Sequence, residues 1–141
     1  MKYSAGYKYK LRDNCYIPVP WSIRTTLMKG PRPDKIIDTS YLKLEPEWGT
    51  LVIKKGYAWD GASGPVPDTK HTMKASLVHD AWYQMIREKT VPYHTKKAAD
   101  AWFGDICVKN GVWGWLANLY VLALGEFGHH SLENGRDIYE I

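Results

Sequence analysis

Residues 72–88 read TMKASLVHDAWYQMIRE, and this stretch decides the fold class of the chain. Its apolar residues recur at three- and four-residue intervals, which is the spacing of one face of an α-helix. The positions concerned are Ala75, Val78, Trp82 and Met85. Thr72 precedes the first turn and belongs to a residue type that often caps helices. The pattern therefore predicts a helix over residues 72–88.

Two further helices are predicted downstream. Thr95 is a candidate cap for a helix over residues 96–108, which has an apolar stripe made of Ala99, Trp102, Phe103 and Ile106. A six-residue loop at 89–94 joins it to the first helix, so we expect the two to pack antiparallel as a hairpin. A third helix at about 113–125 is almost wholly apolar, and we expect it to be buried.

The chain upstream of residue 59 reads as strands and turns. Residues 7–11 and 41–44 alternate apolar and polar side chains, as half-buried strands do, and residues 51–53 are apolar and rich in β-branched side chains. Four prolines punctuate the intervening segments, at positions 18, 20, 31 and 33. No helix of normal length is expected in this part.

The 141 residues are enough for one domain. We expect four parts: β-rich residues 1–58, an Asp- and Gly-containing loop at 59–71, a helical part at 72–125 and a polar tail at 126–141. The expected fold class is α+β, with the β-rich N-terminal region packed on an antiparallel helical hairpin plus a third apolar helix.

Composition narrows the functional classes. The net charge is +4 and the lysines are scattered, which argues against a specific nucleic-acid arm. Seven Trp and ten Tyr against two Phe supply large side chains with polar handles, which suit a surface that meets an amphipathic partner.

Cysteine usage and hydropathy bear on location. Cys15 and Cys107 form neither a CxxC motif nor a zinc pattern, and their spacing gives no support for a disulfide. The N-terminus lacks the apolar core of a signal peptide, and the longest apolar run, at 113–124, is too short to span a bilayer. We therefore expect no transmembrane segment, and reduced thiols in a cytoplasm.

Two polar residues interrupt the apolar stripes of the hairpin. His79 follows Val78, and the apolar pair Ala81-Trp82 comes directly after Asp80. Asp100 lies among alanines and aromatics. A buried polar group without a partner costs about 1–3 kcal/mol, so we expect His79 and Asp100 to bond across the hairpin. A carboxylate on one imidazole nitrogen raises the basicity of the other, which makes His79 a candidate general base toward water.

The neighbours of His79 suggest a metal site. Asp80 points about 100° around the helix from His79, so it can face the loop that contains Asp60. Two carboxylates together with loop carbonyls suit Ca²⁺. Tyr83 is one turn beyond His79, and we expect its hydroxyl to bond Asp100.

Three strings in this order, DGASGP at 60–65, LVHDAWY at 77–83 and ADAWFGD at 99–105, resemble secreted phospholipase A2, especially its small bacterial branch. The resemblance covers about residues 59–125. It implies His79 as the base, Asp60 and Asp80 as calcium ligands, Gly61 as a carbonyl ligand, Asp100 as the partner of His79 and Tyr83 as a supporting hydroxyl. The chain departs from that family at Ala62 and Ser76, where cysteines would be expected.

Over the whole chain, the same motifs with a β-rich start resemble an uncharacterised domain family common in tailed-phage and prophage genomes. This resemblance implies a phage-encoded protein, in the host cytoplasm or in the virion. The leading hypothesis is calcium-dependent hydrolysis of a phospholipid ester at a membrane surface. The alternative is a non-catalytic virion component or host-interaction protein that binds a phage structural or host protein.

Other assignments of single residues stay open at this point. Ser63 is a candidate nucleophile, although no G-x-S-x-G elbow frames it. A zinc ion is a second option for the metal, with the ligand set His71, His79, Asp60 and Asp80. His129-His130 reads as a solvated turn, and Trp113 and Trp115 read as core residues or as the wall of an acyl-chain slot.

Overall fold

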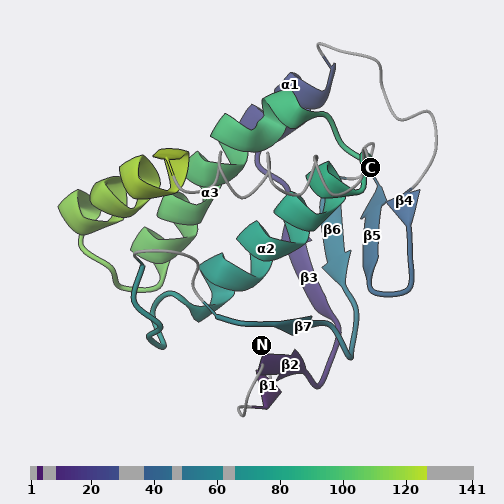
Figure 1. Ribbon diagram of the computed structural model, residues 1–141, viewed down its shortest axis with the longest axis horizontal. Coiled ribbons are helices and arrows are strands. Elements are labelled where there is room, and N and C mark those ends of the chain that lie inside the picture. The colour runs from purple at the N-terminus through teal and green to yellow at the C-terminus, as the bar shows by residue number, and fades with distance from the viewer. Residues whose placement is uncertain (1–2, 5–8, 29–36, 46–48, 62–65, 127–141) are drawn as a thin grey trace.

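Alternating apolar residues build most of the N-terminal half into antiparallel sheets. The computed structural model describes residues 3–4, 9–28, 37–45, 49–61 and 66–126 (Figure 1). The larger sheet has the strand order β3 (Cys15–Pro18), β6 (Thr50–Ile53), β5 (Leu42–Glu45), β4 (Ile37–Asp38). Its β5–β6 register pairs Leu42 with Ile53 and Leu44 with Leu51, and all four side chains are fully buried. One face of this sheet is therefore core.

The second sheet is smaller, and its last strand precedes the long helices in the chain. Its order is β1 (Tyr3–Ser4), β2 (Tyr9–Leu11), β7 (Ala58–Trp59). Tyr9 pairs with Trp59 across β2 and β7. The Trp59 indole is buried and donates a hydrogen bond to the Ser76 hydroxyl, 3.1 Å away. That bond fixes the end of β7 against the helix that contains Ser76.

The strands predicted at 41–44 and 51–53 are confirmed as β5 and β6, and the described part of 7–11 is β2. The expectation that no helix fits upstream of residue 59 is wrong. Residues Trp21–Met28 form helix α1 and bury Ile23 and Leu27, which are four residues apart. Pro20, which we read as loop punctuation, begins the helix because its carbonyl accepts the Ile23 and Arg24 amides.

The two predicted long helices are present. Helix α2 spans Met73–Arg87, and helix α3 spans Lys96–Lys109 after a short 3₁₀ turn, η1, at Tyr93–Thr95. Trp82 of α2 donates to the Thr95 hydroxyl just before α3, while His79 of α2 packs against Phe103 further along α3. Contacts that run in opposite chain directions make α2 and α3 an antiparallel hairpin, as predicted.

The predicted capping roles of Thr72 and Thr95 are wrong. Both residues occupy the N-cap position, but neither side chain bonds an amide of the helix it precedes. The Thr72 hydroxyl donates to the Pro67 carbonyl and the Thr95 hydroxyl to the Pro92 carbonyl. Both side chains are buried, so they satisfy carbonyls of the incoming loops instead.

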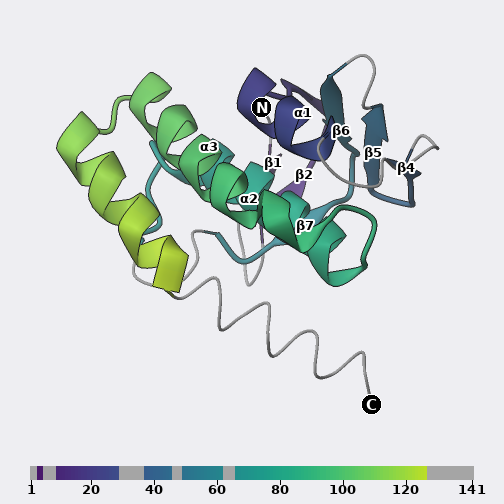
Figure 2. The same ribbon diagram turned by 90° about the horizontal axis from the view of Figure 1, so that it is seen from above.

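The third helix, at 114–126, forms where the sequence predicted one, but it is not buried. In Figures 1 and 2 it lies at one end of the molecule beside α3. Its contact side is narrow: Ala117 and Leu124 are buried, and a Cβ on Gly104 of α3 would meet Val121 at 2.6 Å. Gly104 thus permits close packing along one side only.

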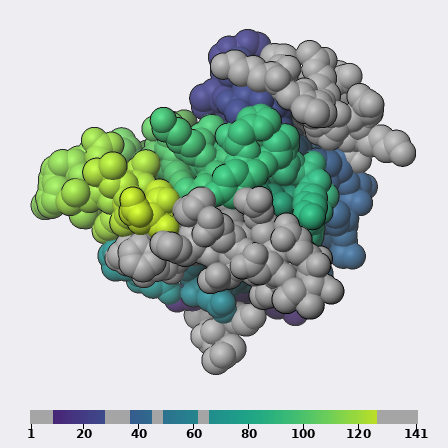
Figure 3. Space-filling model, turned by 45° about the horizontal axis from the view of Figure 1, so that its top comes forward, coloured from purple at the N-terminus to yellow at the C-terminus, as the bar shows by residue number. Residues whose placement is uncertain are grey.

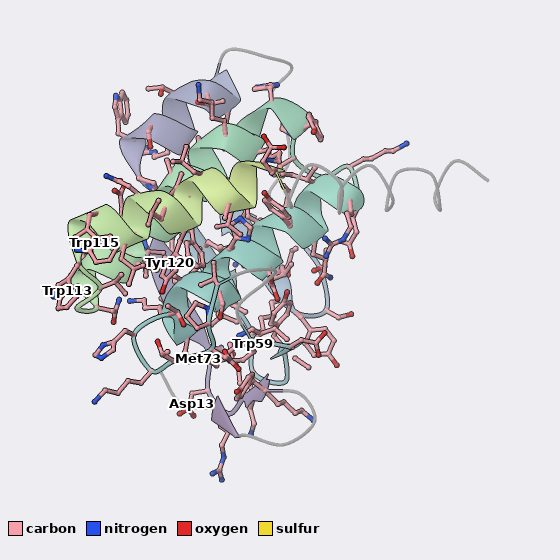
Figure 4. All side chains as sticks on the ribbon, turned by 60° about the vertical axis from the view of Figure 1, so that its left-hand side comes forward. Asp13, Trp59, Met73, Trp113, Trp115 and Tyr120 are labelled. Carbon is pink, nitrogen blue, oxygen red and sulfur yellow. The ribbon has the colours of Figure 1, made fainter. Side chains whose placement is uncertain are left out.

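The other side of this helix presents large apolar side chains to the surface. We call Trp113, Trp115, Leu119 and Leu122 the Trp/Leu stripe; their exposed fractions are 69%, 60%, 52% and 70%. In the space-filling view of Figure 3, the helix at 114–126 lies at the surface at one end of the molecule. Figure 4 shows Trp113 and Trp115 at the outer edge of that end. The expectation of a buried helix failed because an all-apolar pattern does not specify which residues find a partner.

Two further expectations concern the thiols and the membrane. Cys15 and Cys107 are both free, so no disulfide joins them. Burial raises the pKa of the Cys107 thiol to about 11, which keeps it protonated at neutral pH. Within the described ranges, no helix is long and apolar enough to cross a bilayer.

The contrast between buried and exposed tryptophans gives a stability prediction. We expect Trp82→Phe to lower the free energy of unfolding by about 1–3 kcal/mol, because it leaves a cavity and removes the bond to Thr95. The matched change Trp113→Phe, at an exposed indole, should alter it by less than about 0.5 kcal/mol. Denaturant unfolding measures both. Equal losses in the two variants would contradict the placement of Trp82 in the core.

Candidate functional site

The two polar residues singled out in the hairpin bond to each other. His79 of α2 and Asp100 of α3 are joined by a hydrogen bond of 2.7 Å between His79 Nε2 and Asp100 Oδ1. Both residues are only 3% exposed. They meet because each stands near the middle of its helix in an antiparallel pair, as the sequence predicted.

Two more donors converge on the same carboxylate. The Tyr83 hydroxyl donates to Asp100 Oδ1 at 2.5 Å, which confirms the expected bond. The Lys96 ammonium donates to Asp100 Oδ2 at 2.8 Å, and its side chain is 11% exposed. We did not predict Lys96, although its spacing of four residues from Asp100 within one helix was a visible signal.

The surroundings of Asp100 determine its charge. Burial raises the pKa of this carboxyl group, but the hydrogen bonds from His79, Lys96 and Tyr83 together outweigh burial and lower it below the usual value. Asp100 is therefore an ionised carboxylate at neutral pH, and a carboxylate can only accept hydrogen bonds.

This charge state sets the tautomer of His79. Because Asp100 accepts, the proton between the two residues belongs to His79 Nε2. In the neutral imidazole the lone pair then lies on Nδ1. Within the described part of the chain Nδ1 has no hydrogen-bond partner, and no fully buried side-chain nitrogen or oxygen there lacks one. The lone pair of His79 Nδ1 is therefore not used by any described residue.

Aromatic rings hold the imidazole in place. The Tyr83 ring lies 4.0 Å from the His79 ring, centroid to centroid, and the Phe103 ring meets it edge-on at 5.5 Å. Burial and the negative charge of Asp100 raise the pKa of the Tyr83 hydroxyl far above its ordinary value. Tyr83 therefore remains a donor at every physiological pH, and the orientation of His79 is fixed on two sides.

The loop after β7 contains the predicted calcium ligands. Asp60 is exposed, whereas Gly61 is buried with a φ of +92°, a conformation that favours glycine. The Asp68 carboxylate packs against Gly61, 2.5 Å from where a Cβ would lie, and accepts a hydrogen bond from the Tyr9 hydroxyl. Asp68 was not among the predicted residues, because the loop sequence gives no sign that the chain returns to Gly61.

A hydrogen bond stands where the phospholipase A2 resemblance would place a cysteine. Ser76 accepts from the indole of Trp59, which directly precedes Asp60. The Ser76 hydroxyl itself donates to the Met73 carbonyl, so both of its roles are used inside the fold. The loop that begins at Asp60 is thus attached to α2 three residues before His79, without a covalent link.

Asp80 follows His79 but has different surroundings. It is half-buried, and after burial its charge is the largest cause that raises the pKa of Tyr57, two residues before Trp59. Asp80 is therefore close enough to Tyr57 for its charge to act there, and the prediction that Asp80 faces the loop containing Asp60 stays a prediction.

The structure contradicts the zinc hypothesis and leaves the calcium hypothesis untested. Within the described ranges, no three His, Cys, Asp or Glu side chains come close enough to hold a metal ion together. The zinc set of His71, His79, Asp60 and Asp80 is therefore not assembled, and His71 bonds the Asn110 carbonyl instead. The calcium prediction invokes only two carboxylates and a carbonyl, and stays a prediction. Ser63 and His129-His130 lie outside the described residues.

A comparison with known protein families identifies the group to which this fold and site belong. A family model matches residues 37–124, well over half of the chain. The chain belongs to the family described as "Protein of unknown function (DUF1353)". No curated protein and no solved structure matches the chain.

The DUF1353 match includes the residues of the candidate site. It begins at β4 and ends near the end of the third helix, so it includes His79, Tyr83, Lys96 and Asp100. The strands β1 to β3 and helix α1 precede it. The expectation of an uncharacterised domain family is confirmed.

The ionised state of Asp100 gives a pH prediction. Its lowered pKa adds stability that is present above about pH 4 and is lost as the pH falls through the lower folded-state value. Between about pH 4 and 2, the free energy of unfolding should therefore fall less steeply in Asp100→Asn than in the wild type. Denaturant unfolding at a series of pH values measures this, with Asp105→Asn, an exposed site on α3, for comparison. A slope for Asp100→Asn as steep as that of the wild type would contradict the assignment.

Proposed function

We propose that this DUF1353 protein is a hydrolase in which His79 activates water to attack an ester. The observation that carries the proposal is the hydrogen bond from His79 Nε2 to an ionised, buried Asp100, since it leaves the lone pair on Nδ1. A general base must be oriented and must have a lone pair that no other group uses, and this arrangement supports both requirements.

The steps follow from that arrangement. Nδ1 of His79 accepts a proton from water as the water oxygen bonds to the ester carbonyl carbon, which gives a tetrahedral oxyanion and an imidazolium. The imidazolium is stabilised because Nε2–H donates to the Asp100 carboxylate. When the carbon–oxygen bond to the leaving group breaks, Nδ1–H returns the proton to the departing alkoxide. The products are a carboxylic acid and an alcohol, and His79 is again neutral.

The predicted donor set fits calcium in kind. Asp60, Asp80 and the Gly61 carbonyl are all oxygen ligands, which a hard cation prefers. The bond between Trp59 and Ser76 holds the residue before Asp60 against α2. When bound there, Ca²⁺ would stabilise the negative charge that develops on the carbonyl oxygen.

The substrate class that we propose is a phospholipid in a membrane surface. Supporting this, the Trp/Leu stripe exposes four large apolar side chains, and Trp115, Leu119 and Leu122 recur at the spacing of one helix face. The rings of Trp113 and Trp115 lie 5.9 Å apart. Tryptophan is a residue type enriched at the boundary between lipid and water.

The resemblance to tailed-phage and prophage proteins extends the proposal to origin. We propose a phage-encoded enzyme that meets lipid from the host cytoplasm or from the virion. The Trp/Leu stripe also favours one alternative, a non-catalytic virion component or host-interaction protein, because an exposed apolar patch of this kind often binds a protein. The two functions differ in whether His79 is needed.

We expect His79→Gln to lower phospholipid hydrolysis by at least about 100-fold, because it removes the general base. Release of fatty acid from vesicles in the presence of calcium measures this, and calcium chelation should abolish the wild-type rate. His94→Gln, at an exposed histidine, is the matched control and should keep the rate. A wild-type protein without any calcium-dependent esterase activity would overturn the proposal in favour of the non-catalytic alternative.

We expect the double change Trp115→Ser and Leu122→Ser to weaken binding to phosphatidylglycerol vesicles by about tenfold or more, since burying one leucine is worth about 1.5–3 kcal/mol. Co-sedimentation in a His79→Gln background measures binding without hydrolysis. The control is Trp21→Ser, which removes an indole of similar exposure, 63%, from α1. Equal binding by both variants would contradict the lipid assignment, as would a dimer that only the stripe change dissociates.

A further inference from the structure

Lys96 is placed where a helix does not favour a lysine. It is the first residue of α3, and the positive end of the helix dipole disfavours a cation there. A lysine four residues before an acid is also the less favourable order for a pair within one helix. The helix itself therefore gives no account of why this side chain is ordered.

The neighbouring residue shows the contrast. Lys97 occupies the same helical turn and is exposed, as expected for a lysine, whereas the Lys96 side chain is nearly covered. Removing an ammonium group from water is costly unless partners replace the water. Lys96 has two such partners.

The first partner explains the orientation of the carboxylate. His79 and Tyr83 both bond Oδ1 of Asp100, and Lys96 bonds Oδ2. Without Lys96 the carboxylate would lose its cation, and Oδ2 would lose a donor 2.8 Å away. The group could then rotate or take up a proton, and either change removes the acceptor that fixes the tautomer of His79.

The second partner lies on another element. The Lys96 ammonium also donates to the Gly125 carbonyl at 3.2 Å, in the helix at 114–126. One ammonium group thus contacts both the carboxylate of the site and the helix that presents the Trp/Leu stripe.

We propose that Lys96 is a positioning residue, which holds Asp100 in the orientation that His79 uses and links that orientation to the seating of the helix at 114–126. Its effect on catalysis rests on the proposed function, whereas its effect on the His79–Asp100 bond and on the helix does not.

The test compares Lys96→Met with Lys97→Met. In proton NMR, the Nε2–H of His79 should give a low-field resonance, identified by its absence from His79→Gln. We expect this resonance to move or disappear in Lys96→Met, to stay unchanged in Lys97→Met, and to return toward the wild-type position in Lys96→Arg. In hydrogen exchange, amides at 114–126 should exchange faster in Lys96→Met only. An unchanged resonance in folded Lys96→Met, or unchanged exchange at 114–126, would overturn the corresponding half of the proposal.

A second variant keeps the inference testable if Lys96→Met does not fold. Lys96→Met combined with Asp100→Asn removes the uncompensated charge, so the double variant should be more stable to denaturant than Lys96→Met alone. A double variant no more stable than the single one would show that Lys96 does not act through Asp100, and would overturn the proposal.

The kinetic readout separates this inference from the proposed function. Lys96→Met should lower kcat by about tenfold or more, as partners of a catalytic group typically do, with KM unchanged. An equal loss in Lys97→Met, or a change in KM alone, would contradict a positioning role. If the wild type hydrolyses nothing, the proposed function fails, while the resonance and exchange measurements still decide the role of Lys96.

Discussion

A buried, ionised carboxylate is costly, and the arrangement around Asp100 shows how this fold compensates for one. Three donors from two helices converge on it: Lys96 from its own helix α3, and His79 and Tyr83 from α2. These bonds lower the pKa of Asp100 against the effect of burial. They also fix the register of α2 on α3, because a shift of either helix by one residue would leave a charge without partners. The proposed chemistry depends on the same bonds, since they decide which nitrogen of His79 has the lone pair.

The β-rich half contributes by placing one loop. Strand β7 pairs with β2, and Trp59 at its end bonds Ser76 on α2. The chain then turns through Gly61, whose positive φ is compatible with the close approach of Asp68. Asp60 is therefore delivered beside the helix that carries Asp80. A hydrogen bond between an indole and a hydroxyl makes this attachment, and the thiols of Cys15 and Cys107 are both free.

The helix at 114–126 joins the two aspects of the molecule that bear on function. On one side it packs against Gly104 of α3 and accepts a bond from Lys96. On the other it presents the Trp/Leu stripe. A partner that covers the stripe would therefore contact the same helix that accepts the bond from Lys96. Lys96 and Gly125 are far apart in the sequence, but the Lys96 ammonium bonds both the Gly125 carbonyl and the Asp100 carboxylate.

The sequence by itself determined the two long helices, their antiparallel packing, two strands and the bonds of His79 and Tyr83 to Asp100. These features follow from periodicity, from a short connection and from the cost of leaving polar groups unpaired, all of which are local or pairwise. Helix α1 escaped prediction because it is a single short segment whose start depends on Pro20. Lys96, Asp68 and the Ser76 bond were decided by the tertiary structure, since each is defined by a partner that only the fold brings near. The exposure of the third helix belongs with them: an apolar pattern states what a helix can bury, and the remaining chain decides how much of it is covered.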